Sequence, residues 1–127
     1  MVLLFAHRGG TDHDHPENSI AAMARALDLG LSLESDVRLS IDGVAVLVHD
    51  PYVRGDRFFP RRVRRLTAAK LAGYGVITLD ELYRELGTDF ELSIDVKDPA
   101  AVPATLAVAD RAGATERLWL VHDSIYT

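Results

Sequence analysis

The stretch LSLESDVRLSIDGVAVLVHD, residues 31–50, decides the fold. Apolar and polar residues alternate over residues 31–39, which is the period of a β-strand whose two faces meet different surroundings. Asp42–Gly43 is a turn dipeptide, and residues 44–48 form an unbroken apolar run that is typical of a strand buried on both faces. The stretch therefore predicts two consecutive strands, the second of which ends just before His49.

Helix and strand patterns alternate on both sides of this stretch. Further strands are predicted over residues 2–6, 90–96 and 118–121, and helices over residues 17–29, 78–86 and 100–111, with Gly30, Gly87 and Gly113 as their stops. This alternation is typical of α/β proteins with a parallel sheet. We expect one domain over residues 1–127, with a loop insertion over residues 52–75.

The composition excludes several classes of protein. With 48% hydrophobic and 26% charged residues the chain can bury a core, and its formal net charge of −5 argues against nucleic acid as a partner. The absence of cysteine excludes disulfides, thiolate zinc sites and a cysteine nucleophile. No apolar run approaches the roughly 18 residues of a transmembrane helix. These features predict a protein without a transmembrane segment, located in the cytoplasm.

Two acidic residues on one predicted strand are candidate metal ligands. Glu34 and Asp36 are two residues apart, so their side chains share a face. Two carboxylates on a buried face repel each other unless a cation lies between them, and Ca²⁺ or Mg²⁺ would suit their oxygen atoms. The spacing alone equally fits an acidic pair that faces solvent.

Polar residues stand near the ends of most predicted strands: His7, Asp36, His49, Asp95 and His122. The carboxyl ends of the strands of a (β/α) barrel meet at one mouth, so this placement favours a barrel over a doubly wound sheet. We interpret His122 as a structural residue of the core.

The chemistry of the remaining side chains points to phosphoryl transfer. His7 and His49 could act as acid and base on opposite sides of a scissile bond. Arg8 and Lys97 would supply fixed positive charge to an anionic substrate.

Six linked motifs resemble those of the glycerophosphodiester phosphodiesterases. They are His7-Arg8-Gly9, Pro16-Glu17-Asn18-Ser19, Glu34-x-Asp36-Val37, Asp42-Gly43 leading to Val48-His49-Asp50, Thr78-Leu79-x-Glu81-Leu82 and Asp95-x-Lys97. The resemblance implies a TIM-type barrel that hydrolyses glycerophosphodiesters to glycerol 3-phosphate and an alcohol.

The resemblance also implies roles for individual residues. Glu34, Asp36 and Asp95 would bind one divalent cation, Ca²⁺ or Mg²⁺, although position 95 usually holds glutamate in this family. His7 and His49 would be the acid/base pair, and Arg8, Glu17 and Lys97 would line the phosphate site. The Asp-x-Lys motif is also similar to that of the sphingomyelinase D branch of phospholipases, which is the alternative activity. A non-catalytic module that binds phosphodiesters is a second alternative.

The length of the chain limits the barrel to a part. A complete barrel has eight strands and roughly 250 residues, whereas the patterns in these 127 residues predict five strands. The sequence therefore predicts only the N-terminal half to five-eighths of a barrel. A parallel sheet that stops there exposes its edges, so we expect self-association through them.

One basic cluster stands out in this acidic chain. Six arginines lie between residues 54 and 65, interleaved with Phe58 and Phe59. They could bind a phosphate-rich partner or a membrane surface, but a solvated loop is the plainer interpretation.

Overall fold

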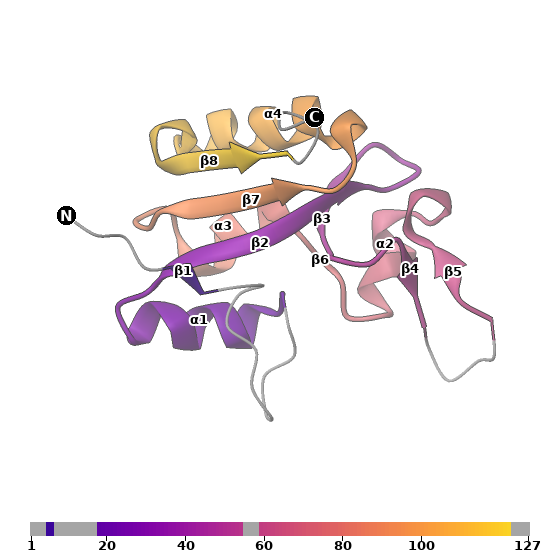
Figure 1. Cartoon of the computed structure of the whole chain (residues 1–127), viewed down its shortest axis with the longest axis horizontal. Coiled ribbons are helices and arrows are strands. Elements are labelled where there is room, and N and C mark those ends of the chain that lie inside the picture. The colour runs from indigo at the N-terminus through magenta and orange to yellow at the C-terminus, as the bar shows by residue number, and fades with distance from the viewer. Residues whose placement is uncertain (1–4, 7–17, 55–58, 123–127) are drawn as a thin grey trace.

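A computed structural model describes residues 5–6, 18–54 and 59–122 (Figure 1). Its strands are β1 (Phe5–Ala6), β2 (Ser32–Leu39), β3 (Ala45–Leu47), β4 (Tyr52–Val53), β5 (Arg61–Arg62), β6 (Ile77–Thr78), β7 (Leu92–Val96) and β8 (Leu118–Val121). Its α-helices are α1 (Ile20–Asp28), α2 (Ala68–Ala72), α3 (Leu79–Leu86) and α4 (Val102–Ala112), and its 3₁₀ turns are η2 (Val63–Arg65), η3 (Pro99–Ala101) and η4 (Thr115–Arg117). Three of the predicted site residues, His7, Arg8 and Glu17, lie outside the described residues.

The described residues form a mixed sheet that contains a half barrel. Strands β1, β2, β7 and β8 are parallel neighbours in that order, while β3 and β6 extend the sheet in antiparallel pairing from β2. The expectation of five barrel strands is corrected to four, because the run over residues 44–48 pairs backwards with β2 instead of following it through a crossover. Four parallel strands are half of an eight-stranded barrel.

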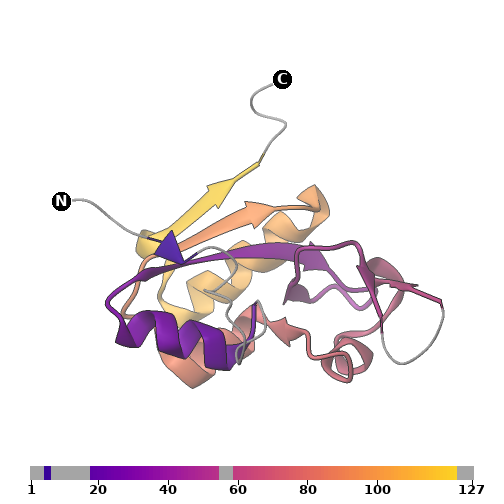
Figure 2. The ribbon, with the colours of Figure 1, turned by 60° about the horizontal axis from the view of Figure 1, so that its bottom comes forward.

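The helices cover one face of the parallel strands. Figure 2 shows α1, α3 and α4 beneath β1, β2, β7 and β8. The strand residues that face these helices are buried in the main core: Leu33, Val37, Leu92, Ile94 and Val96. The alternate residues of these strands point to the opposite face, which is the inside of the barrel. They include Glu34, Asp36, Asp95 and Trp119. The sequence pattern on β2 therefore separates an apolar outer face from an acidic inner face.

Local signals set the ends of the helices. Ser19 caps α1, its Oγ accepting a hydrogen bond from the Ala22 N–H at 3.1 Å. At the other end Gly30 takes a φ of +78°, and the N–H groups of Gly30 and Leu31 return to carbonyls of the last turn. Thr78 makes a reciprocal capping box with Glu81 at the start of α3.

The turn between β2 and β3 is held by Asp42. Its Oδ1 accepts hydrogen bonds from the Ser40 hydroxyl and, at 3.0 Å, from the Ala68 N–H at the start of α2. These two bonds hold the pKa of Asp42 below its usual value. The predicted turn at Asp42–Gly43 is thus confirmed, with Gly43 at a φ of +78°.

Residues 52–75, expected as a loop, contain short elements of their own. Strands β4 and β5 pair as an antiparallel hairpin, followed by η2 and α2. A second buried cluster lies beneath them, formed by Val46, Val53, Val63, Leu66, Leu71 and Val76. Figure 1 shows this region beside the carboxyl end of β2. None of the helices in the described ranges has the length and apolar character needed to cross a membrane.

Replacing Asp42 by asparagine should destabilise the fold in a pH-dependent way. A carboxylate whose pKa is lowered on folding stabilises the folded state above its unfolded pKa, and this contribution is lost as the pH falls through the folded value. The free energy of unfolding of Asp42→Asn should therefore lie below wild type at neutral pH and approach it as the pH falls below the ordinary aspartate pKa of about 3.9. Urea unfolding across this range measures the difference.

The control for this prediction is Asp110→Asn, which removes an exposed carboxylate from α4. A difference between Asp42→Asn and wild type that is the same at every pH would contradict the role of the charge.

Candidate active site

Two aspartates from neighbouring strands form the centre of the site. Parallel pairing of β2 with β7 places Asp36 directly opposite Asp95, and Glu34 stands two residues earlier on the same face of β2. Asp36 is only 2% exposed, and the buried Oδ1 of Asp95 has no hydrogen-bond partner among the described residues. A buried carboxylate oxygen without a partner is an open acceptor, so this pair offers oxygen atoms that a hard cation would bind.

Lys97 neutralises part of this acidic charge. Its Nζ lies 2.7 Å from Asp95 Oδ2, and its backbone N–H donates to the Val37 carbonyl at 3.1 Å, which continues the pairing of β2 with the chain beyond β7. Because Asp95 and Lys97 are two residues apart on an extended segment, both side chains reach the same face. The contact agrees with the expectation that the two side chains share a face, while the roles of Asp95 as a metal ligand and of Lys97 in the phosphate site stay predictions.

Asn18 anchors Asp36 from the other side. Its Nδ2 donates to Asp36 Oδ2 at 3.4 Å, and its Oδ1 accepts from the Ser35 hydroxyl at 2.7 Å. Asn18 is buried and has a φ of +55°, a left-handed conformation that asparagine tolerates better than most residues. Sequence reasoning gave Asn18 no role in the site. The signal available was an Asn-Ser pair at the start of a predicted helix.

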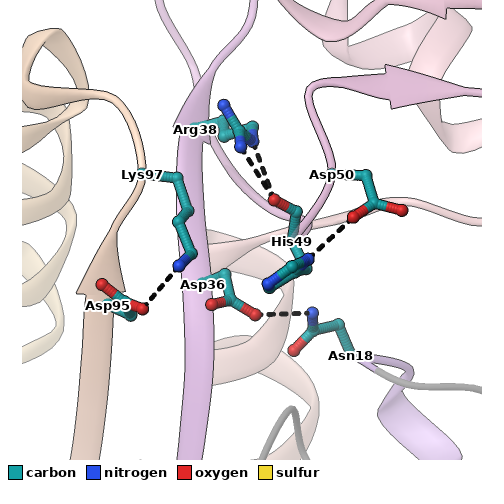
Figure 3. Close-up of polar contacts among 7 residues, drawn as sticks. All are labelled: Asn18, Asp36, Arg38, His49, Asp50, Asp95 and Lys97. Atoms are coloured by element: carbon teal, nitrogen blue, oxygen red, sulfur yellow. Dashed lines mark hydrogen bonds and ion pairs between the residues drawn. The ribbon is translucent and has the colours of Figure 1, made fainter.

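The β2–β3 hairpin brings His49 to the aspartates. The hairpin extends beyond Asp36 and then returns, and the Val48 N–H donates to the Asp36 carbonyl at 3.1 Å. His49 was expected at the carboxyl end of a parallel strand, but it follows the antiparallel strand β3 and arrives from the opposite direction. The expected proximity of His49 to Asp36 nevertheless holds, and Figure 3 shows Asp36 between Lys97 on one side and His49 on the other.

His49 is fixed at both its backbone and its ring. The Nε and Nη2 atoms of Arg38 donate to the His49 carbonyl at 3.1 and 2.9 Å. The imidazole Nδ1 lies 2.7 Å from Asp50 Oδ1 (Figure 3). A carboxylate on one ring nitrogen orients the imidazole and favours the tautomer with its proton there. Arg38 received no role from sequence reasoning, although its place two residues after Asp36 is the signal that would have put it on the same face.

Burial and charge shift two pKa values in opposite directions. Burial raises the pKa of Asp36 above its usual value, and the nearby Asp95 adds to this, while Asn18, His49 and Lys97 partly oppose it. Burial lowers the pKa of Arg38, against the opposing effect of Asp36 and neighbouring acids. The site therefore holds the Asp36 carboxylate and the Arg38 guanidinium partly out of water. A bound cation would stabilise the first, and a bound anion the second.

The full set of three predicted metal ligands is not gathered in the described part of the chain. Within residues 5–6, 18–54 and 59–122, no three acidic, histidine or cysteine side chains converge in a group that could hold a metal ion. Asp36 and Asp95 are neighbours, while Glu34 lies on the same inner face, level with Ser93. The three-ligand metal site stays a prediction. His7, Arg8 and Glu17 are outside the described ranges, so their positions in the site stay predictions too.

Fold and site together define a half barrel of the TIM type with a polar site at the carboxyl ends of its strands. Residues 7–119 match the glycerophosphoryl diester phosphodiesterase family, and the chain belongs to this family. It is 35% identical over 125 residues to the "Probable glycerophosphodiester phosphodiesterase 2" of Mycobacterium tuberculosis, covering 91% of this chain and 46% of that protein. It is 36% identical over 111 residues to a glycerophosphodiester phosphodiesterase of Caldanaerobacter subterraneus, covering 76% of this chain and 45% of that one.

The solved structures of this family share the fold. The glycerophosphodiester phosphodiesterase of Agrobacterium tumefaciens superposes with a TM-score of 0.78 at 25% identity, covering 97% of this chain and 58% of that one. The present chain thus spans about half the length of the curated relatives it matches, in agreement with the four parallel strands observed.

Replacing Asn18 should weaken the fold through the two hydrogen bonds that it makes. Asn18→Gly keeps the left-handed backbone but removes both bonds, so the free energy of unfolding should fall by about 1–3 kcal/mol. Asn18→Ala should lose roughly a further 1 kcal/mol because its Cβ disfavours this conformation. Urea unfolding at neutral pH measures both values. A glycine variant as stable as wild type would show that these bonds contribute nothing.

Proposed function

We propose that this protein hydrolyses glycerophosphodiesters to glycerol 3-phosphate and an alcohol. The observation that carries the proposal is the convergence of His49, Asp36 and the Asp95–Lys97 pair at one place, in a chain of this family. These groups supply the parts that the reaction needs: a proton carrier, acidic ligands for a cation and a positive charge for the phosphate.

A divalent cation, Ca²⁺ or Mg²⁺, would be held by Asp36 and Asp95, joined by Glu34. The fit rests on the unpartnered buried Oδ1 of Asp95 and on an all-oxygen donor set. When bound, such an ion neutralises charge on the phosphoryl oxygens and polarises the phosphorus toward attack. Lys97 would add a second positive charge beside the phosphate, with Arg8 and Glu17 completing that site as the sequence predicts.

His49 would carry one of the two proton transfers. With Asp50 at Nδ1, the ring presents Nε2 to the substrate. One histidine removes a proton from the attacking oxygen, the new P–O bond forms, and the bond from phosphorus to the leaving alcohol breaks. The second histidine protonates that alcohol, and His7 is the candidate partner. The attacking oxygen belongs to water, or to the adjacent glycerol hydroxyl, which would give a cyclic phosphate first.

The four described parallel strands form one wall of a barrel, so we expect weak turnover when these 127 residues are assayed by themselves. On the inner face, Trp119 lies level with Glu34 and Val121 lies level with Asp95. Both side chains are exposed, Trp119 at 50%. A substrate would touch only one wall of the site. Self-association through exposed sheet edges and a cytoplasmic location stay predictions, as do a sphingomyelinase D-like activity and a purely binding role.

His49→Ala should abolish what turnover the chain has. Loss of a general acid or base lowers the rate by about 10² to 10⁴-fold, and release of choline from glycerophosphocholine with millimolar Ca²⁺ or Mg²⁺ measures it. His122→Ala, which removes the imidazole that follows β8, is the control and should keep wild-type activity. Tight binding of glycerophosphocholine without hydrolysis would favour the binding module, and full activity of His49→Ala would refute the catalytic role.

Added Ca²⁺ or Mg²⁺ should stabilise the folded chain against unfolding. An ion that binds only the folded state raises its stability by about 2.7 kcal/mol at a hundred times its Kd. The melting temperature should therefore rise with the ion and fall back with EDTA, and Asp95→Asn should remove the shift. Asp110→Asn keeps the site and serves as the control. A shift of equal size in Asp95→Asn would place the ion elsewhere.

A further inference from the structure

A cationic cavity adjoins the site on the side away from Asn18. It has a volume of about 260 Å³ and lies between the carboxyl end of β2, the segment that follows β7 and the β4–β5 region. Its lining includes four cationic side chains, Arg38, Arg62, Arg64 and Lys97, and one carboxylate, Asp98. In a chain with a net charge of −5, this local excess of positive charge marks a place for an anion.

Two arginines of the cavity, Arg38 and Arg62, are held in place by contacts with the fold. Arg38 uses two of its five N–H donors on the His49 carbonyl, which fixes the guanidinium plane. Arg62 lies over the ring of Tyr52, with its guanidinium carbon 5.6 Å from the ring centroid. Asp98 accepts a hydrogen bond from the Ala100 N–H at 3.0 Å. The single carboxylate is thus engaged with backbone at the start of η3.

The cavity and the site share two residues. Lys97 lines the cavity while its amine contacts Asp95, and Arg38 lines the cavity while it holds His49. A group bound in the cavity would therefore lie next to the groups that act on the phosphodiester. It would also compensate the burial of the Arg38 charge, which lowers the pKa of that side chain.

We propose that this cavity is an anion subsite for the alcohol half of the substrate. It would take glycerophosphodiesters whose alcohol carries a second anionic group, a phosphate or a carboxylate, in preference to those with a neutral or cationic alcohol. The proposal rests on the proposed function, since it assumes that a phosphodiester occupies the adjacent site. A concave cavity that reaches Lys97 fits a small ligand better than a flat lipid surface.

Two ligands that differ by one phosphate test the proposal. Glycerophosphoglycerol and its terminally phosphorylated form are titrated into the full chain by calorimetry, in EDTA to prevent turnover. The phosphorylated ligand should bind about tenfold more tightly, since charge-assisted hydrogen bonds are among the strong ones. The double variant Arg62→Ala/Arg64→Ala should reduce this preference to about twofold or less.

The matched control is Arg61→Ala/Arg65→Ala. It removes the same charge from the same segment, from exposed side chains that do not line the cavity. The control should keep the tenfold preference, and circular dichroism should show all variants folded. Equal affinity of wild type for the two ligands would overturn the proposal, as would a preference that survives in Arg62→Ala/Arg64→Ala or disappears in the control.

Two further binding measurements, with inorganic phosphate and with phospholipid vesicles, test whether the cavity binds anions other than the substrate. Binding of inorganic phosphate that depends on Arg62 and Arg64, without any preference between the two diesters, would overturn the assignment to the substrate. So would arginine-dependent binding to vesicles of anionic phospholipid with the same lack of preference. If neither diester is hydrolysed with Ca²⁺ or Mg²⁺, the proposed function fails while a measured binding preference stands. If hydrolysis occurs without that preference, the subsite alone fails.

Discussion

The parallel pairing of β2 with β7 is the constraint on which the site depends. It sets Asp36 level with Asp95, so two carboxylates share one partly buried face of the sheet. Burial and mutual repulsion would both oppose ionisation, as the raised pKa of Asp36 shows. Every neighbouring polar contact works against this cost: the amide of Asn18 on one side and the ammonium of Lys97 on the other. The acidic centre therefore requires its cationic surroundings.

The hairpin from β2 to β3 returns the chain to the level of Asp36, which places His49 beside it. A helix crossover would have returned the chain to the opposite end of the sheet, whereas the hairpin turns back within a few residues and reaches the level of Asp36 again. The same turn, through Asp42, is tied to the start of α2 and so to the region over residues 52–75. One short element thus sets the place of His49 and one wall of the cationic cavity.

The sequence predicted which residues share a face of a strand better than it predicted strand direction and long-range contacts. The sequence correctly placed Glu34 and Asp36 on one face of β2, and Asp95 and Lys97 on one face of the next parallel strand, because both inferences depend only on the two-residue period of a strand. The antiparallel direction of β3 was missed although the Asp42–Gly43 turn indicates it, since so short a connection joins antiparallel strands only. Asn18 and Arg38 received no role because the local signals place the two residues but do not identify their partners, which lie 18 and 11 residues away in the sequence.

Chemistry and substrate binding are separable in this half barrel. Within the described residues, His49 is held by Arg38 and Asp50, and Asp95 contacts Lys97, so β2, β7 and the hairpin position these proposed groups. Trp119, by contrast, stands in the same row as Glu34 and Ser93 on an open inner face, where a closed barrel would cover it. The affinity for a small diester depends on how much of its surface is enclosed. The cationic cavity, as proposed, would supply a second point of attachment formed by described residues of this chain.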